Sequence, residues 1–397
     1  VWHARLEEFF PMEEFLLPNA GFFTELRSVT ISEPETERPV RVISVPKTLK
    51  TPRIIAIEPV CMQYTQQSLL EVLVPCLEGS SYLKGMVGFT DQTPNQRLAR
   101  EGSLYGSLAT LDLSEASDRV SNRLVKSMLR NFKSLSGAVQ SCRTLRADVP
   151  GHGVIPLTKF ASMGSALCFP MEAMVFLTLI FLGIQRELNR PLTAKDIVSY
   201  SGKVRVYGDD MIVPVRFVQS VILTLELFGL KVNHGKSFWT GKFRESCGRD
   251  YYDGSDVTVT YCRTLLPNNR RDVSEFISTA SFRNQLFKAG LWQAADFLDN
   301  YMEGIAPFPV VGDTSPVVGR HTFVGVQAEK MCPNLHKGLV KGAVVRAVSR
   351  PSELDGYGAL LKFFLKRGIE PYFDKKHLLR YGRPESVDIK IRWASAT

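Results

Sequence analysis

The feature that most constrains the fold is the stretch from Lys203 to Val215, with the sequence KVRVYGDDMIVPV. Two runs that contain several β-branched residues flank Gly208 and Asp209, and this arrangement predicts two antiparallel strands joined by a tight turn. Asp209 and Asp210 place adjacent carboxylates at the turn. Because turns favour glycine and aspartate for backbone reasons alone, this segment by itself predicts a hairpin and leaves its chemistry open.

A further carboxylate precedes this hairpin in the chain. Residues 107–113 (SLATLDL) predict a buried strand that ends near Asp112, and Ser114 and Glu115 are expected to open a helix that continues to about Phe132. We expect the strand end and the hairpin turn to lie together, which would cluster three carboxylates. Such a cluster is unfavourable unless cations neutralise it. Oxygen-only ligands select hard ions, here Mg²⁺ or Mn²⁺.

The other periodic segments predict a mixture of helices and antiparallel strands. A basic hairpin is expected at 41–59, a strand-like segment at 231–239, and another hairpin within 243–263 that turns at Asp253 and Gly254. Apolar residues recur at helical spacing in several segments. The helices expected from that spacing are 62–80, 218–228 with a stop at Gly229, 272–302, and a short amphipathic helix at 357–367.

The most apolar run extends from Leu167 to Leu182 and contains Pro170 and Glu172. It is shorter than the roughly 20 residues that a membrane span requires. This run therefore predicts a buried helix of a protein without a membrane partner.

Composition favours a folded protein whose partner is a polyanion. The chain has 397 residues, 44% of them hydrophobic and 22% charged, which is typical of a globular protein with two or three subdomains. Lys plus Arg outnumber Asp plus Glu by 49 to 40, and this net charge of +9 suits nucleic acid or an ordinary basic surface equally well. Seven scattered cysteines without zinc-like spacing indicate reduced thiols. The chain opens at Val1 without a signal-peptide pattern and is expected to be a fragment lacking its N-terminus.

The order of six short segments resembles that of a known enzyme family. These segments are RVISVPKTLKTPRIIAIEP, LDLSEASD, SMGSALCFPME, VYGDD, GLKVNHGKSF and FRESCG, between Arg41 and Arg263. The series is similar to motifs F, A, B, C, D and E of viral RNA-dependent RNA polymerases. LDLSEASD and FRESCG most resemble the replicase β subunit of the RNA bacteriophages. Ser165 stands where the phage pattern has Asn, and Pro170 with Met171 is similar to narnavirus-like polymerases.

The resemblance implies an α+β fold of the right-hand polymerase type, whose antiparallel palm sheet carries the GDD hairpin. The expected divisions are fingers at 1–106 and 133–160, a palm at 107–132 and 161–263, and a helical thumb with the C-terminal region at 264–397.

The resemblance also implies a metal site. Glu245 matches a carboxylate that phage replicases place near the metals, although a salt bridge with Arg244 or Arg249 is the alternative interpretation. Lys236 matches the lysine proposed to protonate the departing pyrophosphate, a general-acid role. Three aspartates match the residues that bind two Mg²⁺ ions, which Mn²⁺ can replace: Asp112, Asp209 and Asp210.

A nucleotide site is implied beside the metals. Asp118 matches an aspartate that helps to sense the ribose 2′-OH, and a solvated helix residue is the alternative. Cations of the basic hairpin are expected to contact the triphosphate, with a solvated loop as the alternative and with Lys50 and Arg53 favoured. The small residues of the motif B turn would let template and sugar approach. The expected nucleotide-binding residues are Arg41, Lys47, Lys50, Arg53, Asp118, Ser162, Gly164 and Ser165.

The resemblance thus implies an RNA-directed RNA polymerase that replicates a viral positive-strand genome in the cytoplasm of a bacterial host. Its expected partners are RNA, ribonucleoside triphosphates and the host elongation factors Tu and Ts, and initiation is expected without a primer. Three alternatives remain: a reverse transcriptase, which Gly208 and Asp118 argue against; an RNA-binding protein without catalysis; and a two-metal nuclease.

Overall fold

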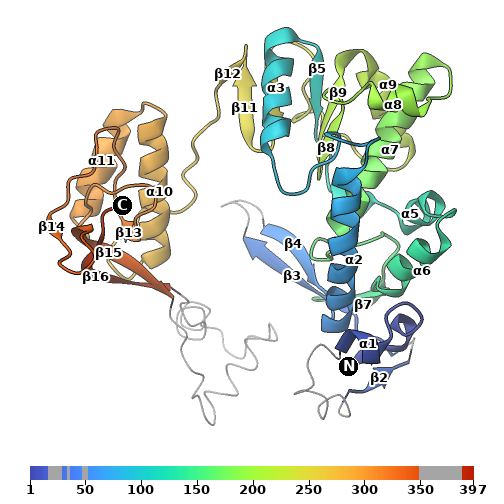
Figure 1. Cartoon of the computed structure of the whole chain (residues 1–397), viewed down its shortest axis with the longest axis horizontal. Helices are drawn as coiled ribbons and strands as arrows, with labels where there is room; N and C mark the ends of the chain where they lie inside the picture. The colour runs from blue at the N-terminus through green and yellow to red at the C-terminus, as the bar shows by residue number, and fades with distance from the viewer. Residues whose placement is uncertain (17–28, 34–35, 47–51, 348–386) are drawn as a thin grey trace. The chain divides into compact units, whose positions relative to one another are not determined.

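A computed structural model of the chain describes residues 1–16, 29–33, 36–46, 52–347 and 387–397. The chain divides into two compact units, Val1–Val259 and Thr260–Thr397, and both mix helices with β-sheet (Figure 1). Each unit is described by itself below.

The first unit is built around a three-stranded antiparallel sheet in the order β5-β9-β8. The sheet is almost entirely buried, and its register sets Leu111 opposite Met211 and Tyr207 opposite Asp210. Both the strand and the hairpin expected from the sequence are therefore confirmed. The strands are β5 (Leu108–Leu111), β8 (Arg205–Tyr207) and β9 (Asp210–Pro214).

Three helices pack around this sheet and its connections. α3 (Thr93–Tyr105) packs on β5, α7 (Cys168–Leu188) packs on β8, and α9 (Val218–Leu227) packs on α7. Gly229, with φ +86°, follows α9, as the sequence predicted. α7 is long and apolar enough to cross a membrane by length and composition, yet 67% of its most apolar window is buried inside the protein. The predicted buried helix is confirmed.

A four-stranded sheet in the order β4-β3-β6-β7 forms a second layer of this unit. The basic hairpin is confirmed as β3 paired with β4, and the predicted helix that follows is α2 (Val60–Gly79). Lys47 and Lys50 lie outside the described residues. The strands are β3 (Val40–Pro46), β4 (Pro52–Ile57), β6 (Arg146–Val149) and β7 (Gly153–Pro156).

The predicted continuous helix from Ser114 to Phe132 is wrong. The structure has two short helices, α4 (Ala116–Arg119) and α5 (Asn122–Met128). Val120 between them is extended because its carbonyl accepts a 2.7 Å hydrogen bond from the Phe160 amide. A tertiary contact overrides the helical pattern here.

The strand-like interpretation of 231–239 is also wrong. Only Val232 and Phe238 form isolated β-bridges, with Leu113 and Thr110 respectively, and a turn separates them. The segment therefore lies beside β5 and Leu113 but does not form a strand.

The expected hairpin within 243–263 is confirmed and is double. Strands β10, β11 and β12 are joined by two tight turns, at Cys247-Gly248 and at Asp253-Gly254, and all four turn residues have positive φ. The strands are β10 (Phe243–Ser246), β11 (Arg249–Tyr252) and β12 (Ser255–Asp256).

The remaining elements of the unit are β1 (Trp2–His3), η1 (Ala4–Leu6), α1 (Met12–Leu16), β2 (Ile31–Ser32), α6 (Lys133–Ser141), α8 (Ala194–Val198) and η4 (Val215–Phe217).

The second unit combines two helices with a sheet. The helical stretch predicted at 272–302 is present as α10 (Val273–Lys288) and α11 (Trp292–Glu303), separated at Gly290 with φ +79°. The helix expected at 357–367 lies outside the described residues. The sheet was not predicted from the sequence, and its strands are β13 (Val317–Val318), β14 (Lys330–Met331), β15 (Gly338–Ala347) and β16 (Val387–Ser395).

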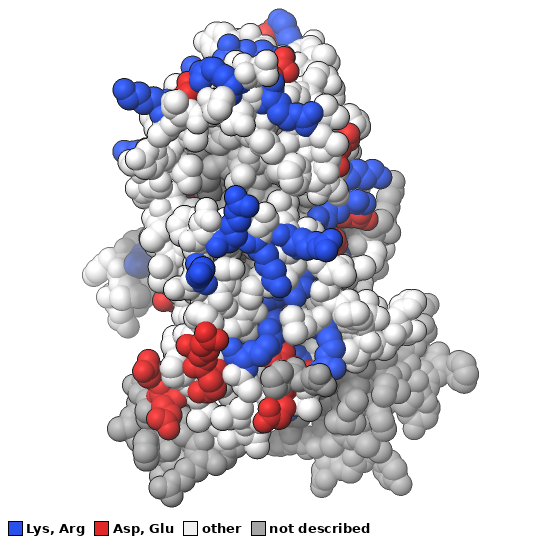
Figure 2. All heavy atoms as spheres, turned by 90° about the vertical axis from the view of Figure 1, so that its right-hand side faces the viewer, with Lys and Arg blue, Asp and Glu red and all other residues white. Residues whose placement is uncertain are grey.

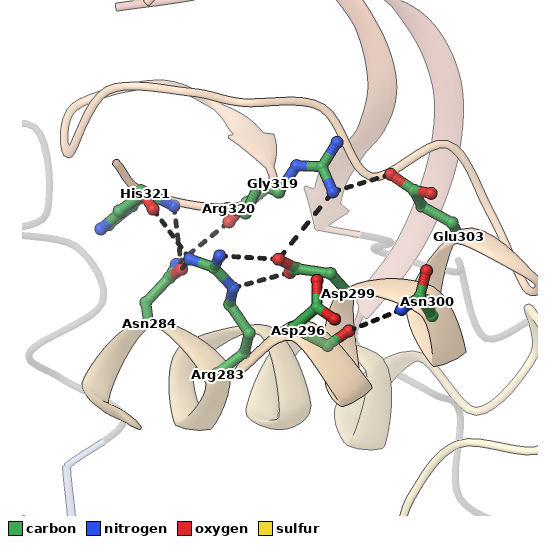
Figure 3. Close-up of polar contacts among 9 residues, drawn as sticks. All are labelled: Arg283, Asn284, Asp296, Asp299, Asn300, Glu303, Gly319, Arg320 and His321. Carbon is green, nitrogen blue, oxygen red and sulfur yellow. Dashed lines mark hydrogen bonds and ion pairs between the residues drawn. The ribbon is translucent and has the colours of Figure 1, made fainter. Parts of the chain in front are cut away.

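A buried ion pair holds the helices of this unit together (Figure 3). Arg283 of α10 donates to both carboxylate oxygens of Asp299 of α11 at 2.6 and 2.7 Å, and to the His321 carbonyl at 2.8 Å. Arg320 approaches the same carboxylate at 3.9 Å and pairs with Glu303 at 2.9 Å. Because a buried charge is costly without a partner, this network makes the packing of α10 on α11 specific.

Candidate active site

Asp112, Asp209 and Asp210 are carried by the ends of adjoining strands. Asp112 follows the last residue of β5, Asp210 begins β9, and Asp209 lies in the turn between β8 and β9. Because Leu111 and Met211 are paired across the sheet, the residues that neighbour them, Asp112 and Asp210, lie at the same end. The local folding of the chain thus brings the two predicted carboxylate elements together.

Gly208 is required by the geometry of the turn. Its φ is +60°, and a Cβ built there would lie 2.5 Å from the Phe169 ring. The ring of Phe169 also packs edge-on against Tyr207, with the centroids 5.4 Å apart. A side chain at this position would therefore meet both backbone strain and a steric clash.

We expect Gly208→Ala to destabilise the first unit by about 2–4 kcal/mol, from strain and overpacking together. Gly229→Ala is the matched control, because Gly229 also has positive φ but faces open space. The control should lose only about 1–2 kcal/mol. Urea unfolding measures both variants, and equal losses would show that contact with Phe169 does not restrict the turn.

Neighbouring segments fix Asp112 and Asp210. The Asp112 amide donates to Ser237 Oγ at 3.1 Å, and its Oδ2 accepts from Asn233 Nδ2 at 3.0 Å. Oδ1 of Asp210 accepts from the Cys247 amide at 3.1 Å and from Ser246 Oγ at 3.2 Å. Ser237 holds the backbone of Asp112, and the other three partners orient the carboxylates without contributing charge.

Burial and neighbouring acids dominate the electrostatics of Asp210. Burial, together with the negative charges of Asp209 and Asp112, raises the pKa of Asp210 to about 6, although the hydrogen bond from the Cys247 amide opposes the shift. Within the ranges that the structure describes, no three Asp, Glu, His or Cys side chains form a ready-made ligand set.

The donors present here fit a hard divalent cation. Asp112, Asp209 and Asp210 offer only oxygen atoms, which Mg²⁺ and Mn²⁺ prefer. A cation bound among them would favour the ionised form of Asp210, whose pKa is raised partly by its two acidic neighbours.

Glu245 and Lys236 lie at the margin of this cluster. Burial and then Asp250 raise the pKa of Glu245, Asp112 also raises it, and Lys236 lowers it. Lys236 itself is an exposed turn residue. The alternative of a salt bridge between Glu245 and a neighbouring arginine is not what the structure shows: Arg244 donates to backbone carbonyls and Arg249 pairs with Asp256.

Asp118 forms an ion pair with Lys159. The Lys159 ammonium donates to Asp118 Oδ1, although the two residues lie 41 positions apart. Asp118 also acts electrostatically on Glu172, as Asp209 does. The Asp118 side chain is 55% exposed, so the alternative of a solvated helix residue stays open.

The turn at Ser162 to Ser165 is held against β4 and α2. The Ala56 amide donates to the Met163 carbonyl at 2.8 Å, and Gly164, with φ +126°, leaves room for the Ala56 carbonyl, which would lie 2.1 Å from a Cβ. Ser165 Oγ donates to Gln66 Oε1 at 2.9 Å, and Ser162 is buried. Gly164 is therefore required for close backbone packing.

The described basic residues of the hairpin lie at its two ends. Arg41 pairs in register with Ile57, and Arg53 pairs with Val45. The two pairs are offset by four positions along the strand, which corresponds to about 13 Å. Because of this distance the structure does not bring the two arginines to one point. Both side chains are exposed.

Sequence reasoning missed Glu172 as a site residue. Burial, together with the negative charges of Asp209 and Asp118, raises the pKa of Glu172 to about 7, and Cys168 Sγ donates to Glu172 Oε1 at 3.3 Å. A single acidic residue inside an otherwise apolar helix was the signal that could have identified it. Asn233 and Lys159 were missed as well, because their partners are distant in the sequence.

We expect Glu172→Gln to flatten the dependence of stability on pH. The folded-state pKa of about 7 exceeds the ordinary value of 4.5, so the folded protein favours the protonated acid. This contribution is present at acidic pH and is lost as the pH rises through 7, on the order of 3 kcal/mol in total. Urea unfolding at several pH values should show this loss in the wild type alone, whereas parallel curves would contradict the burial of a titrating acid.

The fold and site define a mixed α+β protein that carries three aspartates at the end of an antiparallel sheet. A sequence model of the family described as RNA replicase, beta-chain matches residues 22–274, and the chain belongs to this family.

Proteins of RNA bacteriophages are similar to this chain. The RNA-directed RNA polymerase subunit beta of Escherichia virus Qbeta is 34% identical over 262 residues, which cover 64% of this chain and 42% of that protein. The corresponding subunit of Enterobacteria phage SP is 35% identical, covering 56% and 36%, and the beta chain of Escherichia phage MS2 is 34% identical, covering 57% and 38%. The matched part thus spans less than half the length of these curated relatives.

Two solved structures also resemble the chain. The RNA-dependent RNA polymerase of a human picobirnavirus has a TM-score of 0.43 at 11% identity, covering 62% of this chain and 52% of that one. Apo telomerase from Candida tropicalis has a TM-score of 0.42 at 13% identity, covering 66% and 55%.

Proposed function

We propose that this chain is an RNA-directed RNA polymerase that replicates a viral positive-strand RNA by two-metal nucleotidyl transfer. The observation that carries this proposal is the electrostatic coupling of Asp210 to Asp209 and Asp112 at the end of one sheet. Membership of the replicase β-chain family supports it.

In this proposal the palm is at 107–132 and 161–263 and the fingers are at 1–106 and 133–160, so that all of these residues except 260–263 belong to the first unit. The thumb and C-terminal region begin at 264, near the boundary between the two compact units at Val259. The GDD hairpin of β8 and β9 is then the metal-bearing turn of the palm sheet. Its short connection and its pairing with β5 suit this role, because they hold the carboxylates on regular structure.

Asp112, Asp209 and Asp210 would hold the divalent cations, with Glu245 at the margin of the site. Two such ions would activate the attacking RNA 3′-OH and stabilise the leaving pyrophosphate. The chain's own residues prepare the site. Asn233 and Ser237 orient Asp112, and the Cys247 amide together with Ser246 orients Asp210.

Other groups would act on the nucleotide. Lys236, exposed on a turn, would protonate the pyrophosphate. Asp118, whose carboxylate is hydrogen-bonded by Lys159, would accept a hydrogen bond from the ribose 2′-OH. Arg53 at the tip end of the basic hairpin is better placed than Arg41 to meet a triphosphate together with Lys47 and Lys50, because its strand partner, Val45, lies close to the turn.

The proposed substrates are an RNA template and ribonucleoside triphosphates, and the proposed setting is the cytoplasm of a bacterial cell. Host elongation factors Tu and Ts are proposed partners by family resemblance. The matched part of this chain spans 42% of the Qbeta protein. An assay of this chain should therefore include the proposed partners.

The test is incorporation of labelled nucleotides on an RNA template with Mg²⁺, with and without a chelator, and with host elongation factors Tu and Ts added. The proposal predicts metal-dependent products that contain ribonucleotides and are complementary to the template. Preference for deoxynucleotides would indicate a reverse transcriptase, and metal-dependent degradation of RNA would indicate a nuclease. RNA binding without synthesis in the presence of the host factors would contradict catalysis.

A further inference from the structure

Basic residues dominate the chain between Arg119 and Met171. This range contains eight Lys and Arg but one acidic residue, Asp148, whereas the whole chain has 49 basic and 40 acidic residues. Such a local imbalance produces a positive potential on the surface unless the cations are buried or paired.

Two of the eight cations are used inside the protein. Arg143 is buried and donates to the carbonyls of Leu157, Lys159 and Phe160 at 2.6–2.7 Å, and Arg146 donates to the Glu37 carbonyl at 2.8 Å. The others reach the surface at least in part. These surface cations are Arg119, Arg123, Lys126, Arg130, Lys133 and Lys159.

Four of these six cations line one groove. Its volume is ≈ 610 Å³. One wall is the junction of α4 and α5, and the other is the segment 157–159. The Asn122 amide donates to the Thr158 carbonyl at 3.2 Å, and Ser121 forms a β-bridge with Lys159. Backbone contacts therefore hold the two walls together. The groove cations are Arg119, Arg123, Lys126 and Lys159.

The charge of this groove is only partly compensated. Asp118 pairs with Lys159, and Glu115 pairs with Arg119 at 2.8 Å. Arg123 and Lys126 have no ion-pair partner within the part of the chain that the structure describes. Figure 2 shows Lys and Arg side chains gathered across the middle of the face on which α5 and α6 lie in Figure 1.

We propose that this basic groove binds the phosphates of single-stranded RNA. Arg123 and Lys126 lie about one turn apart on α5, Arg130 and Lys133 continue the series, and the Phe132 ring between them is 63% exposed. Spaced cations with an exposed aromatic ring suit repeating phosphates and a stacked base, which is how proteins bind single strands. The choice of RNA over other polyanions rests on the proposed function.

The test compares the full chain with the variant Arg123→Gln/Lys126→Gln/Arg130→Gln. Fluorescence anisotropy follows a labelled oligouridylate of about 20 nucleotides, a length that exceeds one typical binding site. Salt is varied from about 50 to 200 mM, and neither nucleotide nor divalent cation is present. We expect the slope of log affinity against log salt to fall by about 2, and affinity at about 0.1 M salt to fall ~100-fold.

The matched control removes three exposed cations of the same unit elsewhere: Lys84→Gln/Arg186→Gln/Lys195→Gln. It lowers the net charge equally, so it separates the position of the charges from their number. Loss of slope and affinity in the groove variant alone supports the proposal. An equal loss in both variants, or no loss in either, overturns the proposal. The proposal is also overturned if poly-glutamate displaces the labelled RNA as effectively as unlabelled RNA does.

Asp118 and Lys159 line the groove and also belong to the proposed nucleotide site, so the groove variant leaves both unchanged and binding is measured without nucleotide. Asp209→Asn should bind the oligouridylate as the wild type does, because Asp209 does not line the groove. If the groove variant binds weakly while the wild type fails to synthesise RNA, the groove proposal stands and the polymerase proposal falls. Phe132→Leu should lower affinity for the oligouridylate and leave the salt slope unchanged, since stacking involves no counterion release.

Discussion

Replacing Asp112 by asparagine is expected to lower template-directed RNA synthesis by at least about 10³-fold, equivalent to about 4 kcal/mol of transition-state stabilisation. Asparagine keeps an oxygen that can accept the hydrogen bond from Asn233, so the orientation of the side chain is preserved. The variant removes one negative charge and therefore one ligand for a divalent cation.

The same substitution should not unfold the protein. Asp112 raises the pKa of Asp210, so removing its charge relieves a repulsion. We expect unchanged or slightly higher thermal stability together with lost synthesis. Asp91→Asn is the matched control: Asp91 accepts from the Thr93 amide at 2.9 Å, and asparagine can do the same. Synthesis by Asp112→Asn near the level of the Asp91→Asn control would contradict the role assigned to Asp112.

Replacing Arg244 by methionine is expected to destabilise the first unit by about 3–5 kcal/mol. Arg244 is fully buried, and it donates to the carbonyls of Leu108 at 2.6 Å, Phe243 at 2.6 Å and Gly241 at 3.1 Å. Methionine would fill much of the space but leave these carbonyls without their donor. Urea unfolding measures the loss.

Arg249→Met provides the comparison on the next strand. Arg249 is half exposed, and its pair with Asp256 at 3.0 Å lies in water, so its removal should cost no more than about 0.5 kcal/mol. A loss for Arg244→Met as small as this would show that its bonds to the β5 and β10 carbonyls do not hold the sheet to the double hairpin.

The parts of the fold that the sequence predicted correctly are those that local signals determine. Gly208 and Asp209 between β-branched runs specify a hairpin within a few residues, and Gly229 ends α9 because the chain needs positive φ there. The failures involve distant partners. The helix expected after Ser114 is interrupted because Phe160, 40 positions beyond Val120, bonds to the Val120 carbonyl.

The sheet of the second unit shows the same limit. β15 and β16 pair from Leu339 with Ser395 to Ala347 with Val387, and 39 residues separate the two strands in the chain. Neither strand is bounded by a short hairpin turn that would identify the pairing. Contacts of such long sequence separation leave no local pattern.

The candidate site divides in the same way. The carboxylates at 112, 209 and 210 could be proposed from turn and strand patterns, whereas their orienting partners could not. Asn233 lies 121 positions from Asp112, and Lys159 lies 41 positions from Asp118. Glu172 was visible as a lone charge in an apolar run, but that observation was used only to argue against a membrane span.

The most direct test of the central claim is Mn²⁺ binding to the full chain, followed by the loss of the electron paramagnetic resonance signal of the free ion. Wild type is expected to bind Mn²⁺, Asp209→Asn and Asp112→Asn are expected to bind it much more weakly, and Asp91→Asn is expected to bind it as the wild type does. Identical binding curves for all four proteins would contradict the claim that the carboxylates at the end of the β5-β9-β8 sheet hold the catalytic metal.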